Sequence, residues 1–141
     1  MKKILLKTEK NTQQFAKDLV KKLKGGEIIA LEGDLGAGKT TLTQYIAKQY
    51  GIKRVTSPTF VLMKVYDSKI NNKQLVHVDC YRLDDVQELF YLGIEEYLNK
   101  PDTIVIIEWA DKIRKYLQKL KKVTWIKIDI LEKDQRIITV K

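Results

Sequence analysis

The sequence predicts an α/β fold: one domain over residues 1–141, with a mixed, mostly parallel central sheet flanked by helices and antiparallel hairpins at its edges. Two short runs, residues 28–31 and 103–107, are apolar throughout, which is typical of strands buried on both faces of a parallel sheet. Stretches with helical periodicity lie between and after these runs. A chain of 141 residues with ordinary apolar content builds one core, so we expect a single domain.

The other elements follow from the spacing of apolar residues and from the turn residues between them. The first helix is expected to begin at a cap, Thr8 or Asn11, and to end at Gly25-Gly26. A proline in residues 56–60 predicts a loop. Further helices are predicted over residues 39–50, 84–89, 94–98 and 111–120. Further strands are predicted at residues 4–6, 61–66, 74–78, 125–130 and 136–140, the last four forming two hairpins, the final one at a sheet edge.

The chain is strongly basic, with a formal net charge of +9. Such a charge favours nucleotides, RNA or an acidic protein as partners, although lysines on helix exteriors also serve merely to solvate a surface. No segment is apolar for long enough to span a bilayer and the N-terminus lacks an export signal, so we expect no membrane association. The single cysteine, Cys80, permits no internal disulfide, which fits the cytoplasm.

A glycine-rich stretch between the first apolar run and the next helix matches the pattern G-x-x-x-x-G-K-[ST] of a phosphate-binding loop. The strand before it and the helix after it are the context that this motif requires, so we predict a P-loop NTPase-like domain. Backbone N–H groups would surround the phosphates of a nucleotide, Lys39 would add a positive charge, and the Thr40 hydroxyl would ligate Mg²⁺. The predicted nucleotide-binding residues are Gly33, Asp34, Leu35, Gly36, Ala37, Gly38, Lys39, Thr40 and Thr41.

Two acidic residues follow predicted strands and are candidates for the second Mg²⁺ ligand. Asp79 follows strand 74–78 and Glu108 follows strand 103–107, and open α/β sheets place their ligands at such strand ends. One carboxylate would bind the metal while the other positions or deprotonates the attacking water, and the sequence leaves the two roles open. Thr59 lies in a loop that either reaches the γ-phosphate, as switch loops do, or only connects two elements.

Four other side chains have a structural and a functional interpretation. His77 shares a strand face with Asp79 and is interpreted mainly as a hydrogen-bonded structural group. Cys80 is interpreted as a small buried hydrophobe, because no second thiol or histidine has metal-ligand spacing with it. Trp109 has two equally supported interpretations: a residue that stacks on a base or binds a partner, or a core residue. For Trp125 a core position is favoured.

Four stretches, in their order and spacing, resemble the TsaE (YjeE) family of small bacterial P-loop ATPases: residues 33–41, 57–60, 77–83 and 108–109. The resemblance covers nearly the whole chain and implies an ATP- and Mg²⁺-dependent hydrolase that is weak alone and stimulated by its partners. It implies a role in making N6-threonylcarbamoyladenosine beside the anticodon of tRNAs that read codons starting with A. The implied partners are TsaD and TsaB; TsaD performs the transfer, tRNA is reached through the complex, and ATP hydrolysis supports turnover.

The same resemblance implies roles for individual residues. Catalysis is assigned to Lys39, Thr59, Asp79 and Glu108. Metal binding is assigned to Thr40, Asp79 and Glu108. Two residues from opposite ends of the chain, Glu9 and Arg136, align with positions near the nucleotide.

Two other classes of function fit parts of the sequence. A small-molecule kinase shares the loop, the size and the parallel sheet, but such kinases usually carry an arginine-rich lid. Here the four arginines, at positions 54, 82, 114 and 136, are scattered. A non-enzymatic function is an ATP-gated binding module, or a protein that binds tRNA directly through its basic surface.

Overall fold

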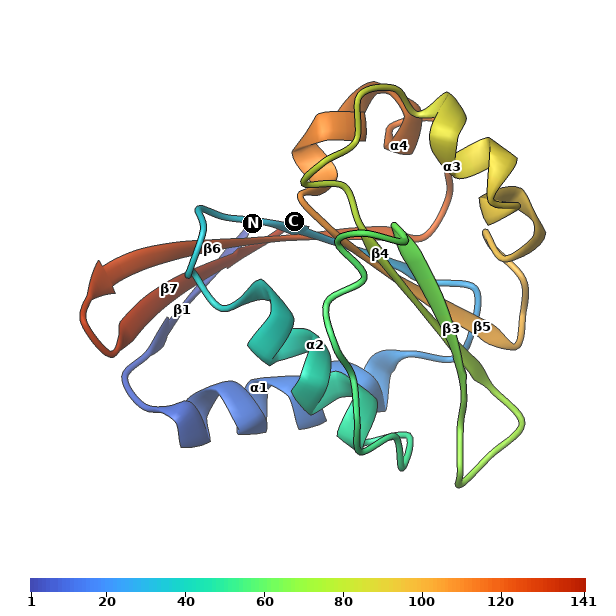
Figure 1. Cartoon of the computed structure of the whole chain (residues 1–141). Helices are drawn as coiled ribbons and strands as arrows, with labels where there is room; N and C mark the ends of the chain where they lie inside the picture. Colours follow the sequence, from blue (N-terminus) through green and yellow to red (C-terminus); the bar gives the residue numbers. More distant parts are fainter.

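The structure, a computed structural model, describes all residues 1–141 and contains one seven-stranded sheet with helices on both faces (Figure 1). In space the strands follow the order β1-β7-β6-β2-β5-β4-β3. The strands are β1 (Lys2–Leu6), β2 (Ile28–Glu32), β3 (Met63–Asp67), β4 (Gln74–Asp79), β5 (Thr103–Glu108), β6 (Val123–Glu132) and β7 (Gln135–Val140). The α-helices are α1 (Glu9–Lys22), α2 (Lys39–Lys48), α3 (Gln87–Tyr91) and α4 (Arg114–Leu117), and the 3-10 helices are η1 (Ile94–Glu96) and η2 (Ala110–Ile113).

The four central strands, β6, β2, β5 and β4, run parallel, and the outer pairs are antiparallel. This arrangement confirms the predicted fold class. Strand β2 is buried except at its last residue and β5 is buried throughout, as their continuous apolar runs predict. The hairpin β3–β4 ends the sheet at β3. The final hairpin β6–β7 lies one strand further in than predicted, because β1 pairs with β7 and forms that edge itself.

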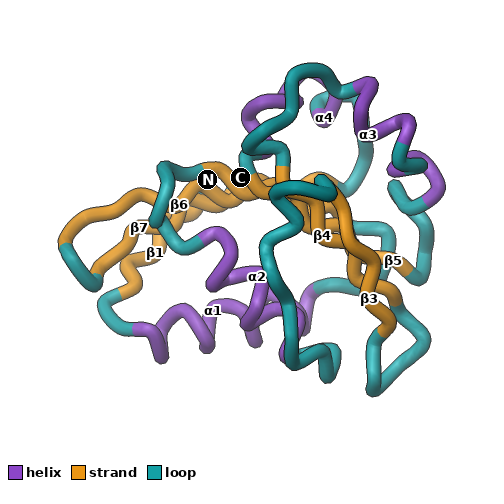
Figure 2. The backbone as a smooth tube through the Cα atoms, in the orientation of Figure 1, coloured by secondary structure: helices purple, strands orange, loops and turns teal.

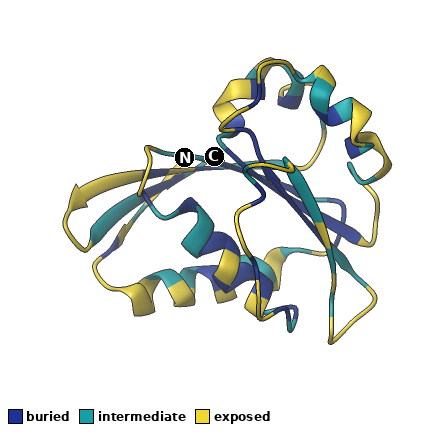
Figure 3. Cartoon of the chain, viewed as in Figure 1, coloured by how far each residue is buried: buried dark blue, intermediate teal, exposed yellow.

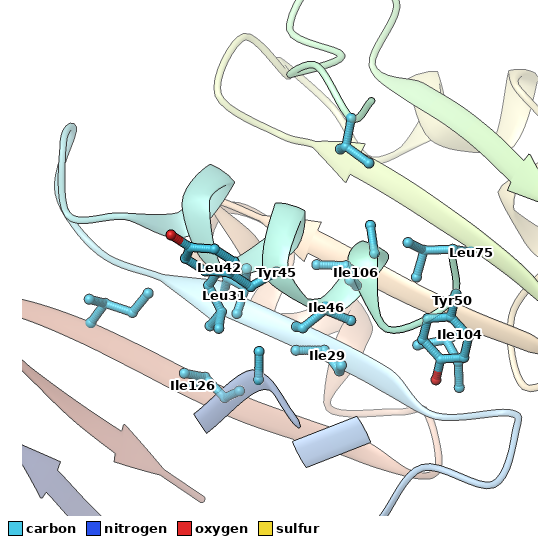
Figure 4. Packing of buried hydrophobic residues seen from close by; sticks show 14 of the residues in the cluster. Ile29, Leu31, Leu42, Tyr45, Ile46, Tyr50, Leu75, Ile104, Ile106 and Ile126 are labelled. Carbon is cyan, nitrogen blue, oxygen red and sulfur yellow. The ribbon is translucent and has the colours of Figure 1, made fainter. Parts of the chain in front are cut away.

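Helices cover the two faces of the sheet as separate layers (Figures 1 and 2). Helices α1 and α2 cover one face, where Leu42 and Ile46 of α2 pack against Ile29 and Leu31 of β2 (Figure 4). These four side chains are fully buried, and each contributes about 2 kcal/mol of hydrophobic stabilisation. The second layer, from α3 to α4, packs against the opposite face of the same strands. The two layers hold the central strands rigidly, which fixes the positions of the strand ends.

The start of α1 is fixed by a capping box that uses both predicted cap residues. The Asn11 backbone N–H donates to Thr8 Oγ1 at 3.3 Å, and the Thr8 backbone N–H donates to Asn11 Oδ1 at 3.2 Å. These bonds satisfy N–H groups that a helix start leaves without partners. The first residue of the helix, Glu9, is therefore held in a defined position.

Three predicted elements differ from the structure. The helix predicted over residues 111–120 is instead η2 followed by α4, with a break at Ile113, where φ is −121° and ψ is 30°. The left-handed backbone at Trp109, with φ of 56°, turns the chain directly after β5, so a tight 3-10 turn follows. Strand β3 begins two residues later than predicted because Leu62 has a φ of 67°, which a strand does not allow. The helix predicted at residues 84–89 begins only at Gln87.

The parallel strands end at one common edge of the sheet, where polar residues follow the buried strand interiors. Asp79 of β4 and Glu108 of β5 are direct neighbours in the strand register. The central strands are buried over most of their length, whereas loops and hairpin tips are exposed (Figure 3). The edge that holds Asp79 and Glu108 also receives the glycine-rich loop between β2 and α2, so the candidate functional site lies there.

Candidate functional site

The glycine-rich loop, residues 33–38, connects the end of β2 to the start of α2, as the motif requires. Gly38 is the N-cap of α2 and has a φ of 110°, a conformation that side chains disfavour. A Cβ atom on Gly33 would lie 2.7 Å from the Ile128 carbonyl oxygen, so only glycine allows this approach to β6. The loop thus places the N-terminus of a ten-residue helix at the sheet edge, an arrangement suited to an anion.

Lys39, the first residue of α2, is buried beneath this loop. Its Nζ donates to the carbonyl oxygens of Gly33 at 2.6 Å and Asp34 at 2.9 Å, and lies 4.0 Å from the centroid of the Trp109 ring. Desolvation lowers the pKa of Lys39, and the negative charge of Glu108 opposes this shift. The ammonium group is therefore held against the loop carbonyls, weakly solvated and close to a carboxylate.

Thr40 and Glu108 form the second part of the site. The Thr40 hydroxyl contacts both carboxylate oxygens of Glu108, at 2.8 Å and 3.1 Å. Glu108 is 2% exposed, and its Oε2 also contacts Nε2 of His77, which is fully buried. A hollow of about 200 Å³ opens beside the pair and is lined by Thr40, Glu108 and Lys39 with the neighbouring loop residues.

Asp79 lies beside Glu108 in the sheet but contacts different groups. Its Oδ2 accepts hydrogen bonds from the Ser57 hydroxyl at 2.8 Å and the Thr59 hydroxyl at 3.0 Å. Its Oδ1 accepts from the Tyr81 backbone N–H at 2.9 Å. The predicted loop containing Thr59 is thereby attached to the end of β4. Asp79 and Thr59 thus form one unit, and Thr40 and Glu108 form another.

The largest cavity, about 540 Å³, adjoins the other side of the glycine-rich loop. Two residues far apart in the sequence, Glu9 at the start of α1 and Arg136 of β7, both line it. Arg136 donates from Nε to the Ala37 carbonyl at 3.0 Å, which ties the last hairpin to the loop. Glu9 accepts from the Tyr45 hydroxyl, and burial together with this bond raises the pKa of Tyr45.

The remaining predicted loop residues are divided between the two hollows. Gly36, Gly38 and Thr41 line both of them, Ala37 lines the larger one, and Leu35 lines the smaller one. Asp34 faces a third hollow beside Trp109. Leu35 is 75% exposed, so this part of the loop presents an apolar side chain to solvent.

The structure adds residues that sequence reasoning left out of the site. Ser57 bonds to the Asp79 carboxylate; in the sequence it was part of the stretch 57–60 but had no role assigned to it. Trp109 lies against Lys39, which places it in the site. Tyr45 reaches Glu9 from α2 and carried no sequence signal of its own, because it reads as a helix-face aromatic residue. Cys80 is fully buried, as predicted, whereas Trp125 is only half-buried and stacks under Arg114.

The donor set fits a nucleotide with Mg²⁺. A hydroxyl and a carboxylate, from Thr40 and Glu108, already contact one another, and both are hard oxygen ligands of the kind that Mg²⁺ prefers. No group of three or more His, Cys, Asp or Glu side chains lies together to hold a metal ion. Mg²⁺ in nucleotide sites needs no such group, because phosphate oxygens and water complete its coordination.

Comparison with known proteins places the chain in a family. A family model described as threonylcarbamoyl adenosine biosynthesis protein TsaE matches residues 6–138. The chain belongs to the TsaE family. A TsaE protein from Rickettsia typhi is 36% identical over 138 residues, which cover 96% of this chain and 92% of that protein. A TsaE protein from Aquifex aeolicus is 34% identical over 115 residues, 79% of either chain.

A solved structure agrees with this assignment. The crystal structure of Bacillus subtilis YdiB superposes with a TM-score of 0.76 and 32% identity, covering 99% of this chain and 83% of that one. The resemblance identified in the sequence is thus confirmed. The TsaE family takes part in tRNA threonylcarbamoyladenosine biosynthesis, so its members work alongside the other proteins of that pathway. None of the helices is long and apolar enough to cross a membrane.

Proposed function

We propose that this protein is a Mg²⁺-dependent ATPase and an accessory subunit in tRNA threonylcarbamoyladenosine biosynthesis. The observation that carries the proposal is the contact between the Thr40 hydroxyl and the Glu108 carboxylate beneath a glycine-rich loop. These oxygens would hold Mg²⁺ together with phosphate oxygens of ATP. The bound ion would supply charge neutralisation on the phosphates.

Lys39 would serve the β- and γ-phosphates. Its Nζ now donates to two carbonyl oxygens of the loop, and a phosphate oxygen is a stronger acceptor than a carbonyl. The exchange of partners would need only rotation of the lysine side chain. Burial strengthens the binding of phosphate by this ammonium group, because a weakly solvated charge loses less hydration when it binds.

Asp79 and Thr59 would position the attacking water. The hydroxyls of Ser57 and Thr59 converge on one oxygen of Asp79, which orients this loop beside the phosphate site. For the two roles that the sequence left open, these contacts support Glu108 with Thr40 as the metal ligands and Asp79 with Thr59 as the groups that would position water.

The cavity between α1 and the last hairpin would take the adenosine part of ATP. It adjoins the glycine-rich loop, and Glu9 and Arg136 line it at opposite ends of the sequence. Because Arg136 is tied to the Ala37 carbonyl, binding there would be coupled to the loop conformation.

The proposed partners are TsaD and TsaB, with TsaD transferring the threonylcarbamoyl group in the cytoplasm and ATP hydrolysis supporting turnover. Two large apolar side chains beside the nucleotide site are exposed, Leu35 by 75% and Phe60 by 83%. Exposed apolar groups of this size next to a polar site are typical of protein-binding surfaces. A partner docked there would exclude water and stimulate a site that is slow alone.

ATPase assays with and without TsaD and TsaB test the proposal. We expect slow hydrolysis by the chain alone, faster hydrolysis with the partners, and losses on the order of 100-fold for Lys39→Ala and Glu108→Gln. Glu108→Gln should also weaken the Mg²⁺ dependence of nucleotide binding, whereas Asp79→Asn should lower kcat and leave that binding largely intact. Rapid hydrolysis indifferent to TsaD and TsaB, or phosphorylation of a small molecule such as shikimate or a nucleotide, would contradict the proposal.

A further inference from the structure

The edge of the sheet opposite the glycine-rich loop carries a cluster of lysines. Here the parallel strands β2, β4, β5 and β6 begin, and the segments leading into them lie together at the right of Figure 1. We give the name lysine edge to six lysines in these segments and at the end of α1 (Glu9–Lys22): Lys22, Lys24, Lys73, Lys100, Lys121 and Lys122.

Hydrogen bonds join these segments into one surface. Lys73 Nζ donates to the Lys24 carbonyl at 2.6 Å, and Lys122 Nζ donates to the Gly25 carbonyl at 3.3 Å. The Asn99 side chain donates to the carbonyls of Gly26 at 3.0 Å and Lys121 at 2.8 Å. The backbone of these segments therefore keeps a fixed arrangement, although the segments come from four separate parts of the chain.

The charges of the lysine edge have no ionic partner. The ion pairs in the structure involve other residues, and five of the six lysines are exposed while Lys73 is half-buried. Two carboxylates share the segments, but Glu27 accepts from backbone N–H groups of Lys24 and Gly25, and Asp102 accepts from the Thr103 hydroxyl. The six lysines exceed these two carboxylates by four positive charges, and a polyanion would relieve the repulsion within this excess.

We propose that the lysine edge binds the phosphate backbone of tRNA directly. This goes beyond the proposed function, in which tRNA is reached through the partner proteins. Flexible ammonium groups without aromatic anchors suit repeated phosphates, whereas a protein interface needs large apolar or aromatic side chains at its centre. Around these segments Ile70 alone is a large exposed apolar residue. An RNA occupant also fits a family that takes part in tRNA modification.

The position of the lysine edge keeps it independent of the nucleotide site. Strands of five or six residues separate the two edges of the sheet, a distance of about 15–20 Å. RNA on the lysine edge therefore leaves the glycine-rich loop open to nucleotide, and substitutions there leave the intrinsic ATPase rate unchanged.

The test measures binding of an unmodified tRNA transcript to the full chain by fluorescence anisotropy at several KCl concentrations. The edge variant is the triple Lys22→Gln, Lys100→Gln, Lys121→Gln, because these side chains make no hydrogen bond that holds the loops. The control variant is the triple Lys10→Gln, Lys17→Gln, Lys115→Gln, which removes the same charge from exposed helix positions elsewhere.

We expect the edge variant to bind tRNA at least about tenfold more weakly at low salt, with a slope of log Kd against log salt smaller by about two to three. The control variant should change affinity by less than about threefold. Equal losses in both variants, or no binding of tRNA by the wild type, would overturn the proposal. The proposal would also be overturned if the edge variant kept its tRNA affinity and instead lost its binding to TsaD and TsaB. The ATPase rates of the same variants are measured as well. Loss of tRNA binding with an unchanged ATPase rate concerns the lysine edge alone, whereas absence of ATPase activity in the wild type would contradict the proposed function.

Discussion

A buried polar column leads from the core to the candidate metal site: His77, Glu108 and Thr40. His77 Nε2 contacts one oxygen of the Glu108 carboxylate, and the Thr40 hydroxyl contacts both oxygens. The His77 ring is fully buried and its Nδ1 has no partner. With Nε2 donating its proton, the imidazole fixes the rotation of the carboxylate, as hydrogen-bond partners of metal ligands commonly do. The sequence favoured a structural role for His77 over a functional one, because its contact with Glu108 depends on pairing between β4 and β5.

Substitution of His77 tests this orienting role. His77→Phe leaves a Glu108 oxygen buried without a partner, so we expect unfolding free energy to fall by about 1–3 kcal/mol. We also expect the Mg²⁺ concentration required for half-maximal ATPase to rise at least about tenfold. His77→Gln places an amide N–H near the former Nε2 and should restore most of the Mg²⁺ response. Urea denaturation and Mg²⁺ titrations of ADP binding and ATPase make the comparison. A Phe variant that is less stable but has an unchanged Mg²⁺ response would assign His77 to structure alone.

Among the helices and strands, those whose position depends on neighbouring residues in the sequence were predicted well. The helix start at Thr8, one of the two cap residues predicted, and the buried strand β5 appear as expected, because neighbouring residues in the sequence produce both. The helix predicted at residues 111–120 is helical only up to Leu117 and is divided into η2 and α4. Trp109 turns out of β5 with a φ of 56° and lies against Lys39 of α2, which the periodicity of a single segment does not reveal.

The capping box gives a prediction for α1, the helix that begins at Glu9 beside the large cavity. Thr8→Ala removes the side-chain acceptor for the Asn11 N–H, so we expect unfolding free energy to fall by about 1 kcal/mol and Tm by about 4 °C. Thr8→Ser keeps a hydroxyl and should change Tm by less than about 1 °C. Thermal denaturation followed by circular dichroism measures both. Equal Tm values for the Ala and Ser variants would show that the cap contributes nothing to stability.

For the whole molecule, the sequence named most residues of the candidate nucleotide site but did not show how they come together. The loop at 33–41 and the two strand-end acids follow from motif and pattern. Their assembly requires β4 and β5 to pair in register, which places Asp79 next to Glu108. The large cavity joins α1 to the last hairpin, and only the family resemblance pointed to Glu9 and Arg136. The lysine edge depends on strand order alone, since its members lie in four segments separated by tens of residues.

Each of the two core layers contains a buried group whose pKa is raised, the Tyr50 phenol in one and the Cys80 thiol in the other, and both predict weaker stability at high pH. Burial raises the pKa of Tyr50, in the α1–α2 layer, to about 12, and that of Cys80, in the other layer, to about 12. Their ordinary values are 10.0 and 9.0. Both groups keep their protons longer in the folded state than in the unfolded state. Their contribution is therefore complete below these ordinary values and is lost as pH rises towards 12.

Tyr50→Phe isolates this effect, because the Tyr50 hydroxyl is buried without a hydrogen-bond partner and its removal leaves the ring packing intact. At pH 7 we expect the variant to be at least as stable as the wild type. Above pH 10 the wild type should lose up to about 1.4 kcal/mol per pH unit relative to the variant, since its unfolded state releases a proton that its folded state retains. For Cys80→Ala, the free energy of unfolding should diverge from that of the wild type in the same way from about pH 9. In addition, the cavity that this substitution creates should lower the stability of the variant by a constant amount at every pH. Urea denaturation at pH 7, 9, 10 and 11 measures the free energies of unfolding. If the difference in free energy of unfolding between wild type and Tyr50→Phe stayed constant with pH, the prediction that both layers lose stability at high pH would be contradicted.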